Sequence, residues 1–179
     1  MRIVGGALRG RRFDPPKNFG ARPTTDFAKE GLFDVLSNYF DFEELTVLDL
    51  FSGTGSISLE FASRGARHID AVEKTYDHQK FIKDSALRLG VTSISVIRQD
   101  AFTFISRCAG RYGLIFADPP YDMEGINTLP ELILSKDLLE DDGWLVVEHS
   151  DRYNFSGLKQ LFDHRRYGSV NFSFFQKNI

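Results

Sequence analysis

Apolar residues occur along the chain in short runs of four or five positions, and most of these runs are followed by a longer segment with a different spacing. In the longer segments apolar residues recur every three or four positions, as on one face of a helix. Each connection has room for a crossover helix, so the runs should form parallel strands. The expected strands are 46–50, 68–72, 93–97, 114–117 and 144–148, and the expected helices between them are 56–64, 77–89, 101–107 and 128–135.

The flanking segments depart from this pattern. Segments 162–167 and 170–175 flank Gly168-Ser169, which predicts an antiparallel hairpin. At the other end, Thr24, Thr25 and Asp26 offer cap residues for a helix that extends to Tyr39. In the sequence, these segments therefore precede and follow the expected parallel strands.

The first 22 residues are expected to form a short β-hairpin arm, because Ile3-Val4 and Arg12-Phe13 are separated by glycines and followed by Pro15-Pro16. Residues 23–179 then form a single domain. The expected fold class is α/β, a Rossmann-like, doubly wound sheet of seven mostly parallel strands with an antiparallel hairpin at its C-terminal end.

The net charge of -3 is unevenly distributed. Residues 1–22 carry six basic side chains and one acid, a balance of +5, so the remainder carries -8. A basic arm on an acidic body suits a polyanion such as nucleic acid, although charge alone fits a solvated tail equally well. The basic residues of the arm are Arg2, Arg9, Arg11, Arg12, Lys17 and Arg22.

Several classes of protein do not fit this sequence. The longest apolar runs are far shorter than the ~20 residues of a membrane span, and no apolar signal segment follows Met1. Cys108 is the single cysteine, and the histidines show no zinc-ligand spacing with it. We therefore expect a soluble cytoplasmic protein with no metal.

Acidic residues stand at or near the ends of the first three expected strands, where doubly wound sheets bind their ligands. Asp49 precedes a turn containing Gly53 and Gly55, whose backbone can approach a ligand closely. Ser58 stands where a dinucleotide fingerprint has its third glycine, and a P-loop lysine is missing, which lowers the rank of NAD and ATP. Glu73 is placed to hold a ribose diol or is a plain surface acid. Asp100 suits an adenine amine, a helix N-cap, or both.

The fourth expected strand ends in the sequence ADPPYD, residues 117–122. Pro119 restricts Asp118 to an extended conformation, and with Pro120 it stiffens the loop. Asp118 and the Pro119 carbonyl can each accept one N–H from an exocyclic base amine, and Tyr121 offers a ring on which the base can stack. A proline-stiffened turn alone would explain the prolines but not the ordered carboxylate and aromatic pair.

Several motifs together resemble a known family. VLDLFSGTGS resembles motif I of class I S-adenosylmethionine-dependent methyltransferases, and DPPY resembles the motif of those that methylate exocyclic amines. RIVGGALRGRRF, RPTTDFAKEGLF, DLFSGTGSISLEFASRGA, ADPPY and RRYGS look, in order, like the RsmD family, the 16S rRNA (guanine(966)-N2)-methyltransferases. Phe27 and Lys29 depart from it, since arginines are usual at both positions.

The resemblance implies S-adenosylmethionine as cofactor and a role for each matching residue. The implied catalytic residues are Asp118, Pro119, Pro120 and Tyr121. The implied cofactor-binding residues are Asp49, Phe51, Ser52, Gly53, Gly55, Glu73, Asp100, Ala101 and Asp118. The implied RNA-binding residues are Arg2, Arg9, Arg11, Arg12, Arg22, Thr24 and Tyr121.

The resulting hypothesis is N2-methylation of a guanine in 16S rRNA, by a monomer that acts on the rRNA or on the small ribosomal subunit during its assembly. One alternative is an adenine-N6 methyltransferase on DNA or RNA, because the same motif suits both amines. Another is a nucleic-acid-binding assembly factor that holds the cofactor without turnover. The intact DPPY sequence argues against the second alternative.

Overall fold

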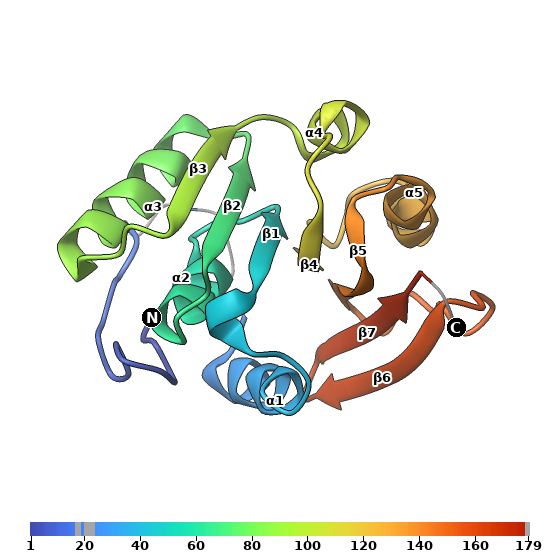
Figure 1. The fold of residues 1–179 in the computed structure, drawn as a ribbon, viewed down its shortest axis with the longest axis horizontal. Helices are drawn as coiled ribbons and strands as arrows, with labels where there is room; N and C mark the ends of the chain where they lie inside the picture. Colours follow the sequence, from blue (N-terminus) through green and yellow to red (C-terminus); the bar gives the residue numbers. More distant parts are fainter. Residues whose placement is uncertain (17–18, 20–23, 178–179) are drawn as a thin grey trace.

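One seven-stranded sheet, in the order β3-β2-β1-β4-β5-β7-β6, forms the centre of the computed structural model (Figure 1). The model describes residues 1–16, 19 and 24–177, so Lys17 and Arg22 lie outside the described residues. The strands are β1 Thr46–Leu50, β2 His68–Glu73, β3 Ile94–Arg98, β4 Tyr112–Ala117, β5 Leu139–His149, β6 Leu161–Tyr167 and β7 Val170–Gln176.

Strands β1 to β5 pair in parallel, as their helical connections predict. β7 runs antiparallel to both of its neighbours and lies between β5 and β6. Its backbone is therefore paired on both sides, and Phe172, Phe174 and Phe175 are fully buried in the cores on the two faces of the sheet. The expected seven-stranded, mostly parallel sheet with a C-terminal antiparallel hairpin is confirmed.

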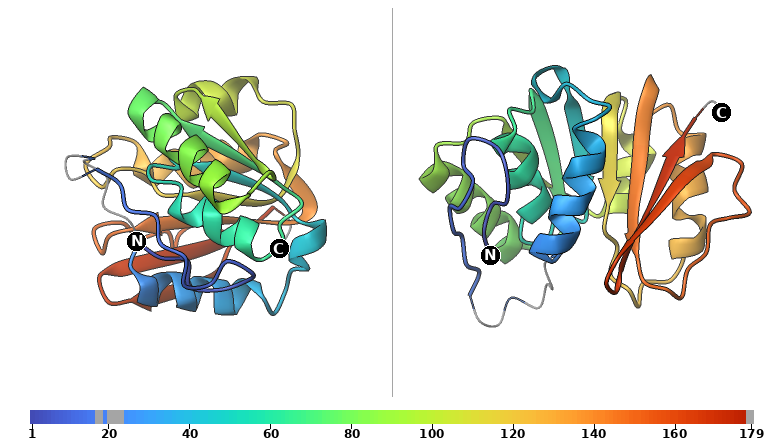
Figure 2. Two further views of the ribbon diagram at one scale, coloured as in Figure 1. Left: turned by 90° about the vertical axis from the view of Figure 1, so that its left-hand side faces the viewer. Right: turned by 90° about the horizontal axis from the view of Figure 1, so that it is seen from below.

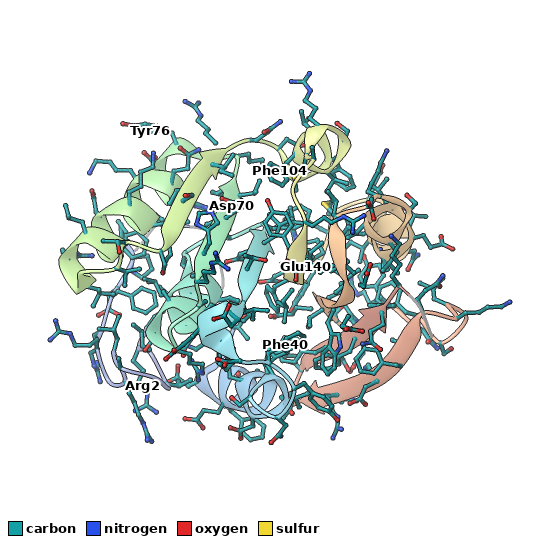
Figure 3. The ribbon with its side chains drawn as sticks, viewed as in Figure 1. Arg2, Phe40, Asp70, Tyr76, Phe104 and Glu140 are labelled. Atoms are coloured by element: carbon teal, nitrogen blue, oxygen red, sulfur yellow. The ribbon has the colours of Figure 1, made fainter. Side chains whose placement is uncertain are left out.

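Helices cover both faces of the sheet (Figures 1 and 2). One face packs against α1 (Asp26–Leu36), α2 (Ser56–Ser63) and α3 (Tyr76–Leu89). The other face packs against α4 (Ala101–Arg107) and α5 (Leu129–Ser135). Phe104 of α4 belongs to the hydrophobic core between these helices and the sheet (Figure 3). Two short 3-10 turns, η1 (Phe42–Glu44) and η2 (Ile126–Thr128), complete the elements.

Most element boundaries lie within two residues of the sequence-based expectation, and two differ by three residues or more. Helix α1 ends at Leu36, not Tyr39, because Ser37 caps it and donates its hydroxyl to the Phe33 carbonyl at 2.6 Å. Strand β5 begins at Leu139, five residues before the predicted start, although Glu140 to Asp142 are exposed. Backbone pairing of Leu139 with Tyr112 extends the strand through a segment with no apolar periodicity.

The amino-terminal hairpin packs on the domain instead of extending away from it (Figure 2). A single antiparallel bridge between Arg2 and Arg12 closes it. Ile3 and Phe13 are buried against Leu59 of α2, and Phe81 of α3 packs on the same cluster. The basic arm therefore has an apolar inner side that belongs to the core of the protein.

A buried ion-pair network holds the hairpin to the helices. Lys29 of α1, 1% exposed, donates from Nζ to the Arg2 carbonyl at 2.6 Å and to Glu60 Oε1 at 3.1 Å. Glu60 of α2 is fully buried, accepts the Val4 backbone N–H at 2.8 Å and also pairs with Arg64. One lysine and one glutamate thus join α1, α2 and the hairpin.

The described part of the chain includes no helix with both the length and the apolar composition needed to cross a membrane.

Candidate active site

A pocket of about 680 Å³ opens at the carboxyl ends of the strands. Its size falls in the range of pockets that bind small molecules. The residues predicted for cofactor, catalysis or substrate that line it are Thr24, Asp49, Phe51, Ser52, Gly53, Glu73, Asp100, Ala101, Asp118, Pro119, Pro120 and Tyr121.

The strand register explains why two of the predicted carboxylates meet. Asp49 of β1 is the register partner of Phe116 of β4, and side chains two residues apart on a strand share a face. Asp118, two residues after Phe116, therefore emerges on the same face as Asp49, the one covered by α1 and α2. The electrostatic influence of Asp49 on Asp118 is consistent with this placement.

The turn after β1 brings backbone into the pocket. Gly53, with φ 52°, donates its N–H to Glu73 Oε2 at 3.0 Å and so ties the turn to the end of β2. Phe51 has φ 61°, a costly left-handed conformation for a side-chain residue and one often found at functional sites. Gly55 does not line the pocket; a Cβ there would lie 2.9 Å from Ile82 Cγ1, so this glycine serves close packing of α3.

Asp49 is a buried carboxyl with hydroxyl partners. Ser58 Oγ donates to its Oδ2 at 2.5 Å, so the residue that breaks the dinucleotide fingerprint instead holds the strand-end acid. Burial raises the pKa of Asp49 to about 7, and the charge of Glu73 adds to the rise, although the hydrogen bonds from Ser58 and Ser52 oppose it.

Glu73 is oriented by backbone groups on both of its oxygens. Besides Gly53, the Thr75 N–H donates to Oε1 at 2.7 Å. His78 lies beside it, with Nδ1 3.6 Å from Oε2 and Nε2 2.8 Å from the Phe19 carbonyl, which fixes the ring. The fixed carboxylate is compatible with the predicted ribose contact.

Asp100 is the N-cap of α4, because its Oδ1 accepts the Thr103 N–H at 3.1 Å. The capping interpretation is therefore confirmed, and it is compatible with the predicted adenine contact because Asp100 and Ala101 both line the pocket.

The ADPPYD segment is held at several points. The Asp118 N–H donates to Leu50 O at 3.4 Å, and the Met123 N–H donates to the Pro120 carbonyl at 2.9 Å, which closes a turn. Tyr121 donates its hydroxyl to Glu148 Oε1 at 3.3 Å, and its carbonyl accepts the Tyr153 hydroxyl at 3.1 Å. Tyr121 is 38% exposed and lines the pocket.

Glu148 is the site residue that the sequence interpretation missed. It is 3% exposed, lines the pocket, and accepts the Thr24 hydroxyl on Oε2 at 2.8 Å. The signal was present, since Glu148 follows the buried run Trp144–Val147 as the other acids follow theirs. The segment was used only to place a strand.

Asp118 and Glu148 influence each other because both are acids in a poorly solvated site. Burial, and then the charges of Glu148 and Asp49, raise the pKa of Asp118 well above its usual range. Burial raises the pKa of Glu148 to about 7, against the lowering effect of its bonds from Thr24 and Tyr121. The pocket therefore concentrates negative charge and favours a cationic ligand.

Among the described residues, the arm arginines Arg2, Arg9, Arg11 and Arg12 do not line the pocket. The hairpin contacts Ser63 at the far end of α2, about 10 Å along the helix from Ser56 in the pocket. Arg2 projects outward and pairs with Asp26 at 2.7 Å (Figure 3), whereas Arg9, Arg11 and Arg12 are exposed. Any RNA contact by these four arginines would lie apart from the pocket.

The two residues that depart from the family pattern differ in environment. Phe27 is 64% exposed and packs edge-on against Tyr167. Lys29 is buried in the ion-pair network described above, where it joins the hairpin to α2.

Within the described ranges, no group of three or more histidine, cysteine, aspartate or glutamate side chains is arranged to hold a metal ion.

The family model described as "Conserved hypothetical protein 95" matches residues 1–176. The chain belongs to this family. The match includes the hairpin, the pocket and the terminal strands, and it confirms the resemblance to the RsmD family.

Named relatives agree with this membership. The Escherichia coli (strain K12) protein named "Ribosomal RNA small subunit methyltransferase D" is 36% identical over 83% of this chain and 71% of its own length. A Bacillus subtilis (strain 168) protein, YlbH, provisionally named an rRNA methyltransferase, is 35% identical over 83% of this chain and 82% of its own. An Escherichia coli structure, provisionally titled a methyltransferase, has a TM-score of 0.84 at 26% identity over 98% of this chain and 97% of its own. The class I methyltransferase fold is thereby confirmed.

Proposed function

We propose that this protein transfers a methyl group from S-adenosylmethionine to N2 of a guanine in small-subunit rRNA. The observation that carries the proposal is the convergence of Asp118 and Tyr121 with the glycine turn and Glu73 in one pocket. The names of the family members above support rRNA as the substrate class. An rRNA substrate would place the protein in the cytoplasm with the assembling small subunit.

The residues present fit the cofactor. The Glu73 carboxylate can accept from two ribose hydroxyls while its backbone bonds to Gly53 and Thr75 persist, because a carboxylate has about four acceptor positions. Asp49 and Asp118 supply negative charge for the cationic amino-acid and sulfonium end. Gly53 lets backbone approach closely, and Asp100 and Ala101 line the side proposed for adenine.

Bound S-adenosylmethionine supplies an electrophilic methyl group. Asp118 and the Pro119 carbonyl would orient the exocyclic amine by accepting its N–H groups, and Tyr121 would hold the base by stacking. The surplus proton of the methylated amine would pass to Asp118, whose raised pKa makes it a better proton acceptor than an ordinary aspartate.

The test uses unmodified small ribosomal subunits, free small-subunit rRNA and methyl-labelled cofactor. Label recovered as N2-methylguanosine supports the proposal, and comparison of the two substrates identifies the preferred one. Label found in N6-methyladenine, or no transfer to either substrate, contradicts it. The first of these results would favour the adenine alternative, and the second the binding protein without turnover.

Cofactor affinity should depend on pH. Asp49 and Glu148 have pKa values raised to about 7, so both are largely neutral at pH 6 and ionised at pH 8. A cationic cofactor prefers the ionised forms, so if one such group must be ionised, affinity for S-adenosylmethionine should fall about tenfold from pH 8 to pH 6. Calorimetry at both pH values measures it.

S-adenosylhomocysteine is the matched control, because it lacks the sulfonium charge and should show a smaller fall. An S-adenosylmethionine affinity that stays constant or rises on acidification would show that these carboxyls do not face the cationic groups.

RNA binding by the arm is best tested without deleting it, because Ile3 and Phe13 are part of the core. Replacing exposed Arg9, Arg11 and Arg12 with glutamine should weaken RNA binding and reduce the slope of log affinity against log salt by roughly 2, if each arginine pairs with a single-strand phosphate. Filter binding at several salt concentrations measures the slope. An unchanged slope would indicate a solvated arm, and the Arg88→Gln variant on exposed α3 surface serves as control.

A further inference from the structure

We propose that Glu148 accepts the N1–H of the target base, so that two carboxylates at neighbouring strand ends select guanine over adenine. The inference rests on the proposed function and names the residue that would determine its base specificity. It concerns a side chain to which the family motifs above assign no role.

The sheet places the two acids side by side. Ala117 of β4 and Val147 of β5 are register partners in a parallel pair, and each is followed directly by an acid. Asp118 and Glu148 therefore leave neighbouring strands at the same level, and both line the pocket that contains Tyr121. A base amine bound at Asp118 would present its adjoining ring edge towards Glu148.

Glu148 differs from the other fully buried glutamate in how its charge is balanced. Glu60 pairs with the cations Lys29 and Arg64, and so has a structural explanation. Glu148 instead accepts hydrogen bonds from two hydroxyls, of Thr24 and Tyr121, and it is the strongest charged influence on the like-charged Asp118. A buried acid in such surroundings costs stability, which is characteristic of functional residues.

Glu148 also has acceptor capacity for a ligand. Its bond from Tyr121, at 3.3 Å, exceeds the 2.5–3.0 Å usual between hydroxyl and carboxylate oxygens, so a better donor could replace it. The bond from Thr24, at 2.8 Å, holds the other oxygen in place. With about four acceptor positions on a carboxylate, an incoming N–H can be accommodated while Thr24 keeps the group oriented.

The chemistry of the two bases gives this arrangement its selectivity. Guanine presents two neighbouring donors on its Watson–Crick edge, the N2 amine and N1–H, which match the acceptors Asp118 and Glu148. Adenine presents an amine donor beside N1, a lone-pair acceptor that would face the Glu148 carboxylate. Sites built to bind a substrate N–H reject analogues that lack it, because the buried acceptor is then left unpaired.

The decisive experiment replaces the target guanine of the rRNA, identified by the labelling test, with 2-aminopurine. This analogue keeps the 2-amine but lacks N1–H. In single-turnover measurements with saturating cofactor, the wild-type protein should methylate guanine about 10- to 100-fold faster than 2-aminopurine. The Glu148→Gln variant should bring the two rates within about threefold, because an amide can both accept from guanine N1–H and donate to 2-aminopurine N1.

Comparing the ratio between variants cancels the different intrinsic reactivity of the two amines. Thr24→Val, which removes a hydroxyl donor but leaves the carboxylate, should retain most of the wild-type ratio. Equal ratios in wild-type and Glu148→Gln would overturn the inference, and Glu148→Ala provides the same comparison if the glutamine variant does not bind S-adenosylhomocysteine. If wild-type protein does not methylate guanine at all, the proposed function itself fails.

Discussion

Replacing Asp118 with alanine should lower the single-turnover rate of methyl transfer by about 100- to 10,000-fold. The substitution removes an acceptor that orients the amine and a base that can take its proton. Affinity for S-adenosylhomocysteine should change much less, because this ligand lacks the sulfonium charge and would keep its proposed contacts with Glu73 and the glycine turn. Rapid-quench kinetics and calorimetry on the same preparation measure the two effects.

Tyr121 supplies the matched controls for this prediction. Tyr121→Phe keeps the ring on which a base can stack and should retain much of the activity, although it loses the 3.3 Å bond to Glu148. Tyr121→Ala loses the ring and should be impaired in base capture. An Asp118→Ala rate close to wild type, or equal damage in both tyrosine variants, would refute this account of the DPPY segment.

Replacing Lys29 with methionine should lower the free energy of unfolding by about 3 to 5 kcal/mol, the usual cost of removing one partner from a buried ion pair. Methionine fills the space of the lysine stem but leaves the Arg2 carbonyl and Glu60 without the Nζ donor. Urea denaturation at constant pH measures the loss. Val4, whose N–H bonds to Glu60, should also exchange its amide hydrogen faster.

The control for Lys29 is Lys80→Met. Lys80 pairs with Asp84 one helical turn away on α3, and both side chains are more than half exposed. Pairs of this kind contribute little, so no measurable change in stability is expected. If the two variants are equally stable, the network around Glu60 does not hold the hairpin.

Most of the fold could be predicted because its central strands, such as β4, are buried on both faces and its helices are amphipathic. The boundaries of β1 and α4 agree with prediction at both ends. β5 begins earlier than predicted because its first residues are held by backbone pairing, which leaves no trace in the spacing of apolar residues.

Docking of the hairpin could not be predicted from local sequence. It depends on Lys29 and Glu60, which pair across 31 positions in sequence and resemble ordinary charged helix residues until the fold buries them. The high basic charge of the segment suggested a nucleic-acid-binding arm or a solvated tail, whereas Ile3 and Phe13 attach it to the core.

The candidate site was predictable in outline because strand-end acids and the glycine turn have local signatures. Glu148 has the same signature near the end of β5, but its proximity to Asp118 depends on the pairing of β4 with β5, which the local sequence does not show. The close packing of Gly55 against Ile82 is visible only in the structure, whereas the cofactor contact of Gly55 stays a prediction.

The position of β7 between β5 and β6 has a consequence for synthesis of the chain on the ribosome. During translation, β6 emerges before the strand that joins it to the rest of the sheet, so neither β5 nor β6 has its final partner until residues 170–176 are available. A nascent chain at that stage exposes an unpaired edge and lacks the buried rings of Phe172 and Phe174. Premature termination shortly before residue 170 should therefore produce an aggregation-prone product, not a slightly shortened protein.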